Sequence, residues 1–436
     1  MFLPRRFYII AIAIVTVIAA GYWWSWLFPT GIVLLALFGA AIAVDCFLLW
    51  RKRGVRATRD CSTRFSCGDQ NPVEITVNND YPYPIHVDVI DEIPFIFQRR
   101  DINFTSQIKA HGQTAIQYSL RPTERGVYGF GRIRVFASTP LGLIQRRYTC
   151  AEPVDVKVYP SYLMLNRYEL LAMSNNLTEF GIKRIRRVGN NTEFEQVKDY
   201  VQGDDYRTIN WTATARRNQL MVNVYRDERS QQIISIIDKG RLMQQAFDGM
   251  TLLDYAINAT LVLSHIAIKK DDKAGIITFN DRFNDFLAPA KTPGHMRNIL
   301  ETLYAQQTSF GESDLSALLA NVIKLVRKRS LLILYTNFSG LNSLNRQLPY
   351  LQQLNQRHRL LVVFFSDTQL QEFINSRAVN TEDYYRHVIA EKIEREKLLI
   401  VNILRQAGIL ALLTSPDQLS VDVVNRYLEI KSRQMF

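Results

Sequence analysis

Three patterns of hydrophobic and polar positions follow one another along this chain of 436 residues, and each predicts a different kind of structure. The first is continuous apolarity: Tyr8 to Leu27 and Gly31 to Trp50 contain almost no charged residue. A helix rises about 1.5 Å per residue, so ~20 residues cross the hydrocarbon core of a bilayer. We therefore predict transmembrane helices over residues 7–27 and 31–50, joined as a two-helix hairpin. A secretory signal peptide is the competing interpretation, but the first stretch is too long for one and a second span follows directly.

The second pattern is an alternation with period two, and it runs from residue 55 to residue 160. Val73, Ile75 and Val77 alternate with polar residues, and turn formers such as His111-Gly112 separate the runs. Several short alternating strands at this spacing predict an antiparallel β-sandwich.

The third pattern fills residues 231–436, where apolar, β-branched runs alternate with segments of helical length. The predicted strands are Ile233–Ile237, Ala274–Phe279, Leu331–Tyr335, Leu360–Phe365 and Ile409–Leu413. The predicted helices are Thr251–Ile268, Met296–Ala305, Leu315–Val326, Leu341–Gln353, Glu382–Ala407 and Leu419–Lys431. Strands that alternate with helices imply right-handed crossovers and a mainly parallel, doubly wound α/β sheet. Residues 161–230 lie between the second and third patterns and form a connector followed by a strip rich in Gly and Asp.

Basic residues flank the two apolar stretches on one side only. Arg5 and Arg6 precede the first stretch and Arg51 to Arg53 follow the second, whereas residues 22–30 contain no Lys or Arg. Positive charge near membrane spans stays on the cytoplasmic side. We therefore expect both termini and the soluble domains to be cytoplasmic.

One acidic residue, Asp45, interrupts the second apolar stretch six residues before Arg51. An ionisable residue inside a membrane span is sometimes part of an ion or proton path. We favour another interpretation, in which Asp45 lies near the cytoplasmic boundary and pairs with Arg5 or Arg6. In an antiparallel hairpin, the start of the first helix adjoins this end of the second.

The net charge of +12 raises the question of a nucleic-acid partner. No helix-turn-helix, zinc-finger or RNA-binding motif accompanies the charge, so we favour a basic surface beside an anionic membrane leaflet and expect no nucleic acid to bind. The spacing of Cys61 and Cys67 does not suit zinc, and the four cysteines are predicted to be free thiols.

Sequence motifs for catalysis are absent. The chain has no P-loop and should not hydrolyse ATP itself, and it contains neither an HExxH pair nor a GxSxG elbow. Covalent catalysis needs an activating base near the nucleophile, and no such pair can be named. We therefore expect a protein that is not an enzyme.

Several motifs occur in an order that is typical of one bacterial family. The predicted sandwich contains Arg125-Gly126-Val127-Tyr128 with Gly131, then Pro140-Leu141-Gly142-Leu143, and ends with Val158-Tyr159-Pro160. The strip contains Glu193-Phe194, Tyr200, Gly203-Asp204, Arg207, Trp211 and Ala215-Arg216, and it is followed by Asp238, Gly240, Arg241 and Met243. Together with the order of domains, these motifs resemble the domain of unknown function fifty-eight family over nearly the whole chain.

The resemblance implies a fold, a cellular location and partners. The last half of this family is similar to von Willebrand A domains, so residues 231–436 are expected to form such a domain. Members are typically encoded beside MoxR-type AAA ATPases. This implies an ATPase partner, a protein client of unknown identity, and a multi-pass protein of the bacterial inner membrane.

The likeness to von Willebrand A domains also implies a Mg²⁺ site, which would need about six oxygen ligands. Asp238 is present at the first loop, but Gly240 and Leu242 replace the two Ser of the pattern. Ser313 can stand where a Thr is expected, and Asn337 stands where the third-loop Asp is expected. We expect no cofactor, with Mg²⁺ on Asp238, Ser313 and Asn337 as the alternative.

Two basic residues beside Asp238 oppose a bound cation by repulsion. Lys239 or Arg241 could instead pair with Asp238 and close the loop. Alternatively, Arg241 could accept a carboxylate from a partner protein directly through bidentate hydrogen bonds. Both alternatives remain open, and the second makes Asp238 and Arg241 candidate partner-binding residues.

The strip is the other candidate site, since it concentrates opposite charges. Its charged residues are Asp204, Asp205, Arg207, Arg216 and Arg217. Asp204, Arg207 and Arg216 would contact a partner if the strip is a docking surface. The interpretation that we favour is a salt-bridged turn in which Trp211 fills an apolar gap, because dense charge networks are commonly structural.

These observations lead to two main hypotheses. The first is a membrane-anchored cytoplasmic adaptor that presents a von Willebrand A-like surface to a MoxR-type ATPase or to its client. The second is a metal-dependent binder that uses a degenerate Mg²⁺ site.

Overall fold

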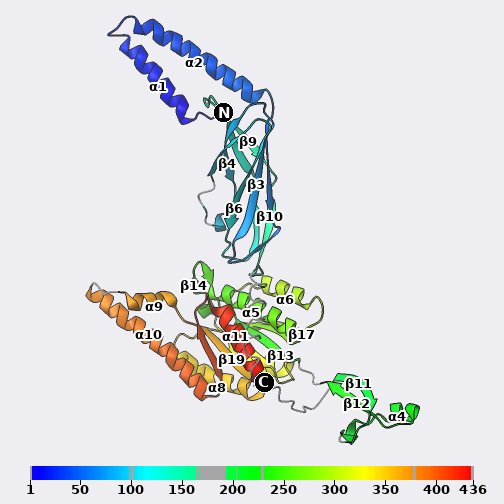
Figure 1. Cartoon of the computed structure of the whole chain (residues 1–436). Helices are drawn as coiled ribbons and strands as arrows, with labels where there is room; N and C mark the ends of the chain where they lie inside the picture. The colour runs from blue at the N-terminus through cyan, green and yellow to red at the C-terminus, as the bar shows by residue number, and fades with distance from the viewer. Residues whose placement is uncertain are drawn as a thin grey trace. The chain divides into compact units, whose positions relative to one another are not determined.

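The computed structural model describes residues 2–97, 99, 103–163, 165, 193–202, 204–226, 230–376 and 380–433. The chain divides into two compact units, Met1–Ser161 and Tyr162–Phe436, whose elements are labelled in Figure 1. Most of the predicted connector, residues 166–192, and Gly203 of the strip lie outside the described residues. All four cysteines are free, as predicted.

The first unit begins with two helices, α1 (Arg5–Ala20) and α2 (Leu27–Trp50), that pack against each other in opposite directions. The rings of Phe7 and Phe38 lie 5.3 Å apart. Farther along, a Cβ on Gly31 would come within 2.5 Å of Cγ1 of Ile18, so the glycine permits the close approach.

Only one of these two helices has the dimensions of a membrane span. In the described part of the chain, α2 alone is long and apolar enough to cross a membrane, at ~36 Å by its 24 residues. With 16 residues, α1 reaches ~24 Å, less than the ~30 Å of a hydrocarbon core. The first predicted span, 7–27, is therefore too long as a helix, because residues 21–26 form the turn, and the second helix begins at residue 27 rather than 31.

Strands dominate the rest of the first unit. They are β1 (Val55–Cys61), β2 (Arg64–Ser66), β3 (Asn71–Asn79), β4 (Ile85–Asp91), β5 (Asn103–Ile108), β6 (Gln113–Leu120), β7 (Gly126–Phe130), β8 (Ile133–Ser138), β9 (Gln145–Cys150) and β10 (Val154–Tyr159), with a 3₁₀ turn, η1 (Phe95–Phe97). They form three sheets, in the orders β1-β3-β6, β2-β10-β7 and β5-β4-β8-β9. Alternate residues of β3 and β4 are buried, so the predicted period of two is confirmed for these strands.

One strand pair departs from the predicted antiparallel arrangement. β2 and β10 run parallel, with Phe65 opposite Val158. Their residues are far apart in the sequence, and no hairpin turn constrains their direction. The β-rich region is therefore mixed rather than wholly antiparallel.

Asp45 joins α2 to the β-rich region. Its fully buried carboxylate accepts a hydrogen bond from the Thr139 hydroxyl and bonds of 3.0 Å each from the backbone N–H groups of Leu143 and Ile144. The predicted pairing with Arg5 or Arg6 is wrong, because three donors of the loop between β8 and β9 occupy the carboxylate.

The β-rich region also caps the C-terminal end of α2, where helix carbonyls lack intrahelical partners. The hydroxyl of Tyr81 donates to the Leu49 carbonyl at 2.7 Å, and that of Tyr83 donates to the Leu48 carbonyl at 2.9 Å. Arg146 donates to the Leu49 carbonyl as well, and its guanidinium lies over the ring of Trp50. The helix end is thus fixed to the strands by side chains as well as by Asp45.

The second unit contains a small strip and a larger α/β sheet. The strip comprises β11 (Glu193–Asp199), the 3₁₀ turn η2 (Tyr206–Thr208), α4 (Trp211–Arg217) and β12 (Met221–Arg226). The strands of the large sheet are β13 (Gln232–Asp238), β16 (Lys273–Phe279), β17 (Phe283–Ala290), β18 (Leu331–Tyr335), β19 (Arg359–Phe365) and β20 (Leu410–Thr414). The turn η3 (Arg241–Met243) and the short pair β14 (Ala246–Phe247) and β15 (Met250–Thr251) follow β13.

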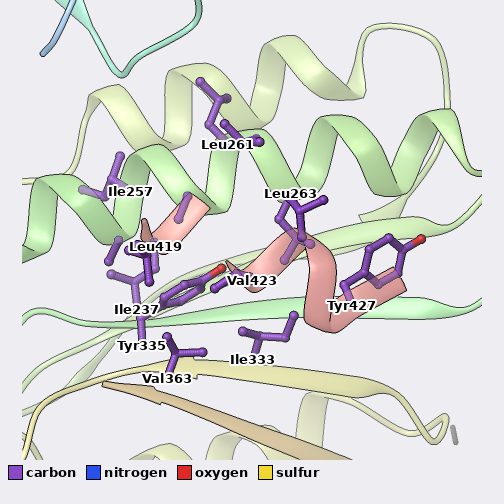
Figure 2. Packing of buried hydrophobic residues seen from close by; sticks show 14 of the residues in the cluster. Ile237, Ile257, Leu261, Leu263, Ile333, Tyr335, Val363, Leu419, Val423 and Tyr427 are labelled. Carbon is purple, nitrogen blue, oxygen red and sulfur yellow. The ribbon is translucent and has the colours of Figure 1, made fainter. Parts of the chain in front are cut away.

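Helices cover both faces of the large sheet. They are α5 (Leu252–Lys269), α6 (His295–Tyr304), α7 (Leu315–Leu325), α8 (Leu341–Arg357), α9 (Thr368–Asn375), α10 (Thr381–Gln406) and α11 (Leu419–Ser432). Figure 2 shows one face, where Ile237, Ile333 and Val363 pack against residues of α5 and α11. On the other face, Ile234 and Ile236 pack with apolar residues of α7, α8 and α10.

The sheet order is β17-β16-β13-β18-β19-β20, and all neighbours are parallel except β16 and β17. The five predicted strands are confirmed, and they form the parallel part. β17 and α9 were not predicted. The sequence of β17, which contains Asp285 and Pro289, lacks the continuous apolar run of a buried strand.

Candidate functional site

Asp238 lies at the carboxyl end of β13, between β16 and β18 in the middle of the sheet. The chain leaves β13 toward β16 on one side, and β18 begins the other half of the sheet, so strand order reverses here. Ligands of open α/β sheets bind at such a point. Asp238 therefore lies where a ligand of such a sheet would bind.

The Asp238 carboxylate is 3% exposed, and all its described hydrogen-bond donors come from three loops. Its Oδ1 accepts from the Ser313 hydroxyl at 2.5 Å and from the Gly240 backbone N–H at 2.8 Å. Its Oδ2 accepts from the Thr336 hydroxyl at 2.7 Å. The burial raises the pKa of the carboxyl above its usual range, although the three hydrogen bonds act in the opposite direction.

Gly240 occupies a position that leaves no room for a side chain. A Cβ there would lie 1.9 Å from Oγ of Ser313 and 2.9 Å from Oδ1 of Asp238. A serine at residue 240 would therefore collide with the hydroxyl of Ser313. Gly240 stands where the metal pattern has its first Ser. Because Gly240 has no side chain, the Ser313 hydroxyl can occupy that space and bond to Asp238.

The oxygens that would surround a Mg²⁺ ion at this point are hydrogen-bonded to one another. Both oxygens of Asp238 already accept hydroxyl hydrogen bonds, and Oδ1 of Asn337 accepts from the Phe338 N–H at 3.0 Å. Among the described residues, no group of three His, Cys, Asp or Glu side chains could hold a metal. The structure thus brings Asp238 and Ser313 together and turns Asn337 toward its own loop. Thr336, one residue earlier, was missed by the sequence interpretation.

Within the described part of the chain, the two basic neighbours of Asp238 contact other groups. Nζ of Lys239 donates to Oε1 of Gln306 at 3.1 Å, and Lys239 is 3% exposed. The Arg241 side chain is 71% exposed and lies 3.9 Å from the Glu312 carboxylate, which is 89% exposed. The predicted pairing of Asp238 with Lys239 or Arg241 is therefore wrong, because hydroxyls and a backbone N–H satisfy the carboxylate. Arg241 is the group that reaches solvent.

The strip holds Asp204, Arg207 and Arg216. Asp204 accepts from Nζ of Lys198 at 2.9 Å and from the Val201 N–H at 3.0 Å, and these bonds hold the pKa of its carboxyl below the usual range. The guanidinium of Arg207 lies over the ring of Tyr206, with its carbon 5.8 Å from the ring centre. Arg216 is exposed in the last turn of α4.

Two aromatic side chains of the strip face solvent. Tyr206 and Trp211 are each 69% exposed, so the prediction that Trp211 fills an apolar gap is wrong. Asn210 explains the position of Trp211, since its side chain caps α4 by accepting the Ala213 N–H at 3.0 Å and leaves Trp211 on the first turn. The strip therefore combines a short, capped helix with exposed aromatic and basic side chains.

Comparisons with known proteins agree with the motifs of the strip. Residues 196–395 match the family described as "Protein of unknown function DUF58". The chain is 24% identical over 284 residues to "Uncharacterized protein YeaD" of Bacillus subtilis (strain 168), an alignment that covers 63% of this chain and 69% of that protein.

Similar solved structures are weak matches. The crystal structure of conserved hypothetical protein BatB from Bacteroides thetaiotaomicron is 9% identical with a TM-score of 0.30, and the match covers 47% of this chain and 100% of that one. The ASH/PapD-like domain of human CEP192 is 8% identical with a TM-score of 0.19, and the match covers 25% of this chain and 89% of that one. Neither likeness assigns a function to this chain.

Proposed function

Since residues 196–395 match the DUF58 family, we propose that this chain is a membrane-anchored cytoplasmic adaptor rather than an enzyme. Its partner is a MoxR-type AAA ATPase, which the adaptor brings to a protein client for assembly or remodelling of a complex. The resemblance of the sequence to a family encoded beside such ATPases supports the choice of partner.

The anchor comprises α1 and α2, inserted as a hairpin in the bacterial inner membrane, where the turn at residues 21–26 enters the membrane together with the shorter α1. The length and apolar composition of α2 support this, as does the antiparallel packing of α1 on α2. Arg5, Arg6 and the cluster Arg51–Arg53 stand at the same end of the hairpin, which favours cytoplasmic termini and cytoplasmic soluble domains.

The C-terminal sheet is proposed to be von Willebrand A-like. Its strand order, with a single antiparallel edge strand and an aspartate at the end of β13, supports this likeness. The closed hydrogen bonding around Asp238 favours a contact surface over a metal site. In that surface, Asp238 supports the loop from within and Arg241 reaches the partner.

One observation carries the adaptor proposal: the strip exposes Tyr206 and Trp211, together with the basic side chains of Arg207 and Arg216. Trp, Tyr and Arg are the residues that most often dominate the free energy of protein–protein binding. Leaving two large aromatic rings in water has no benefit for the folded chain alone, whereas a partner that covers them gains their buried area. The strip is therefore the docking surface for the ATPase.

A pull-down tests this proposal. The full-length chain is the bait in a detergent extract, in ADP and in a non-hydrolysable ATP analogue. We expect a MoxR-type ATPase to co-purify with the wild type but not with Trp211→Ala. Tyr350→Ala is the matched control, since Tyr350 on α8 is 36% exposed and lies outside the strip. Recovery of no AAA ATPase in either nucleotide state would contradict the proposal.

A further inference from the structure

One long stretch of the second unit is free of acidic residues. Between Asp314 and Asp367, the sequence contains seven Lys and Arg residues but no Asp or Glu. Six of the seven lie near the amino ends of the parallel strands β18 and β19, at the end of the sheet opposite to Asp238. We call these six residues the basic patch: Lys324, Arg327, Lys328, Arg329, Arg357 and Arg359.

Hydrogen bonds hold the two loops of the basic patch together. The first loop joins the end of α7 to β18, and the second joins the end of α8 to β19. The Ser330 hydroxyl donates to the Lys328 carbonyl at 2.8 Å, and the Arg359 N–H donates to the Ser330 carbonyl at 2.9 Å. The two loops are therefore adjacent, and their cationic side chains gather at one place.

The charge of the basic patch is not neutralised within the described part of the chain. The ion pairs there involve other side chains, and none of the six residues forms one. All six residues except Arg359 are exposed. The C-terminal ends of α7 and α8 lie here, but each helix end carries only about half a negative charge. Several positive charges at this end of the sheet therefore remain unbalanced.

A buried histidine responds to this charge. His358 is 3% exposed, and neither of its ring nitrogens has a hydrogen-bond partner among the described residues. Burial, and then the charges of Arg357 and Arg329, hold the pKa of His358 below its ordinary value. The imidazole is therefore uncharged near neutral pH. Positive charges from both loops thus act on one point, and no acidic group of the described residues counters them there.

Two aliphatic side chains are exposed beside the cations. Ile323 is 36% exposed and Leu325 is 39% exposed, and they lie on either side of Lys324 in the last turn of α7. At a bilayer surface, basic residues contact anionic headgroups while aliphatic residues enter the boundary with the acyl chains. Single-stranded nucleic acid instead stacks on aromatic side chains, and the basic patch contains none. The combination of cations and aliphatic side chains favours a lipid surface.

We propose that the basic patch binds anionic phospholipid headgroups of the membrane in which α2 is anchored. Guanidiniums such as those of Arg327 and Arg329 bind the headgroup phosphates, and Leu325 enters the headgroup layer. Six basic residues fall within the about four to eight that are typical of segments that recognise anionic lipids.

The inference rests on the membrane anchor of the proposed function and not on the ATPase. A chain anchored by α2 keeps its second unit within reach of the leaflet, so the lipid surface is present at a high effective concentration. Binding through the basic patch also leaves the opposite end of the sheet, with Asp238 and Arg241, available to a protein partner.

Vesicle flotation tests the inference. The full-length chain, in nanodiscs of phosphatidylcholine and without any ATPase, is mixed with vesicles of phosphatidylcholine alone or with added phosphatidylglycerol. We expect the chain to float only with the anionic vesicles, and less so as the salt concentration rises. The double variant Arg327→Glu/Lys328→Glu should bind them about thirtyfold or more weakly, since each basic residue at an anionic surface contributes about fivefold. Arg282→Glu/Lys392→Glu is the matched control, because it changes the net charge equally at exposed residues outside the basic patch. It should float as the wild type does.

A further variant separates contact with lipid from attraction by charge alone. Leu325→Gln should bind anionic vesicles several-fold more weakly but bind inorganic polyphosphate as the wild type does. Equal flotation with both kinds of vesicle, or equal losses in the patch variant and its control, would overturn the inference. Binding of a single-stranded oligonucleotide but not of anionic vesicles would overturn it in favour of nucleic acid. Because no ATPase takes part, a failure here is distinct from a failure of Trp211→Ala to lose the ATPase.

Discussion

Oγ of Ser313 lies 2.5 Å from Oδ1 of Asp238, in the space that a side chain at residue 240 would occupy. The loop after β13 and the loop before α7 are thereby fitted to each other, with Gly240 as the point of closest approach. The arrangement gives the end of the sheet a satisfied hydrogen-bond network. The stability of the chain, its response to divalent ions and its dependence on pH should all reflect this network.

Gly240→Ala should destabilise the protein through the collision with Ser313. Overpacking of this kind typically costs about 1–3 kcal/mol. Chemical denaturation of the full-length chain in detergent measures the change in unfolding free energy. In a double-mutant cycle, Ser313→Gly should cost less in the Gly240→Ala background than in the wild type, because contacting residues couple. Additive effects would contradict the close approach.

Mg²⁺ and Mn²⁺ should not stabilise the chain, because the oxygens around Asp238 already satisfy one another. A ligand at 100 times its Kd adds about 2.7 kcal/mol to the free energy of unfolding, so millimolar binding is easily seen as a rise in Tm. The measurement is thermal unfolding at increasing concentrations of either ion, up to about 10 mM, together with calorimetry. A saturable rise in Tm that Asp238→Asn abolishes would restore the metal-dependent alternative.

The stability contribution of Asp238 should depend on pH. Burial raises the pKa of the carboxyl above its ordinary value, so the folded state binds the proton more tightly than the unfolded state. The resulting stabilisation is fully present below the unfolded pKa and is lost as pH rises through the folded pKa. Relative to Asp238→Asn, the wild type should therefore gain unfolding free energy on acidification. A relative loss would show that the hydrogen bonds from Ser313 and Thr336 outweigh burial.

Asp45→Ala should loosen the junction between α2 and the strands. It leaves the N–H groups of Leu143 and Ile144 without an acceptor, and each buried unsatisfied group costs about 1–3 kcal/mol. Hydrogen exchange of these two amides should accelerate. Asp88→Ala is a control, since Asp88 accepts bonds from side chains only. Unchanged exchange in Asp45→Ala would mean that packing alone holds the loop.

The sequence predicted the elements that have strong local patterns. The parallel strands were visible because both of their faces are buried, which requires a continuous apolar run. β17 was not visible, since Asp285 and Pro289 are tolerated only at an edge. Local pattern thus reveals apolar strands, including β20 at one edge, better than an edge strand that contains polar residues and proline.

Contacts between distant residues were harder to predict. Asp45 is bound by a loop about one hundred residues away, whereas hairpin geometry suggested Arg5 and Arg6 at the start of the first helix. The sequence interpretation chose Asn337 and missed Thr336. In the register of β13 and β18, Ile237 lies opposite Tyr335, so the residues that follow them, Asp238 and Thr336, lie at the same level. Such a register is a property of the folded sheet.

The affinity of the full-length chain in nanodiscs for a purified MoxR-type ATPase tests the adaptor claim most directly. Trp211→Ala should weaken binding about thirtyfold or more, since a central aromatic contributes at least ~2 kcal/mol. Its unfolding free energy should change by less than about 0.5 kcal/mol, because the side chain is 69% exposed. Tyr350→Ala should bind as the wild type does. Equal affinity of Trp211→Ala and the wild type, or no binding of the wild type in any nucleotide state, would contradict the account.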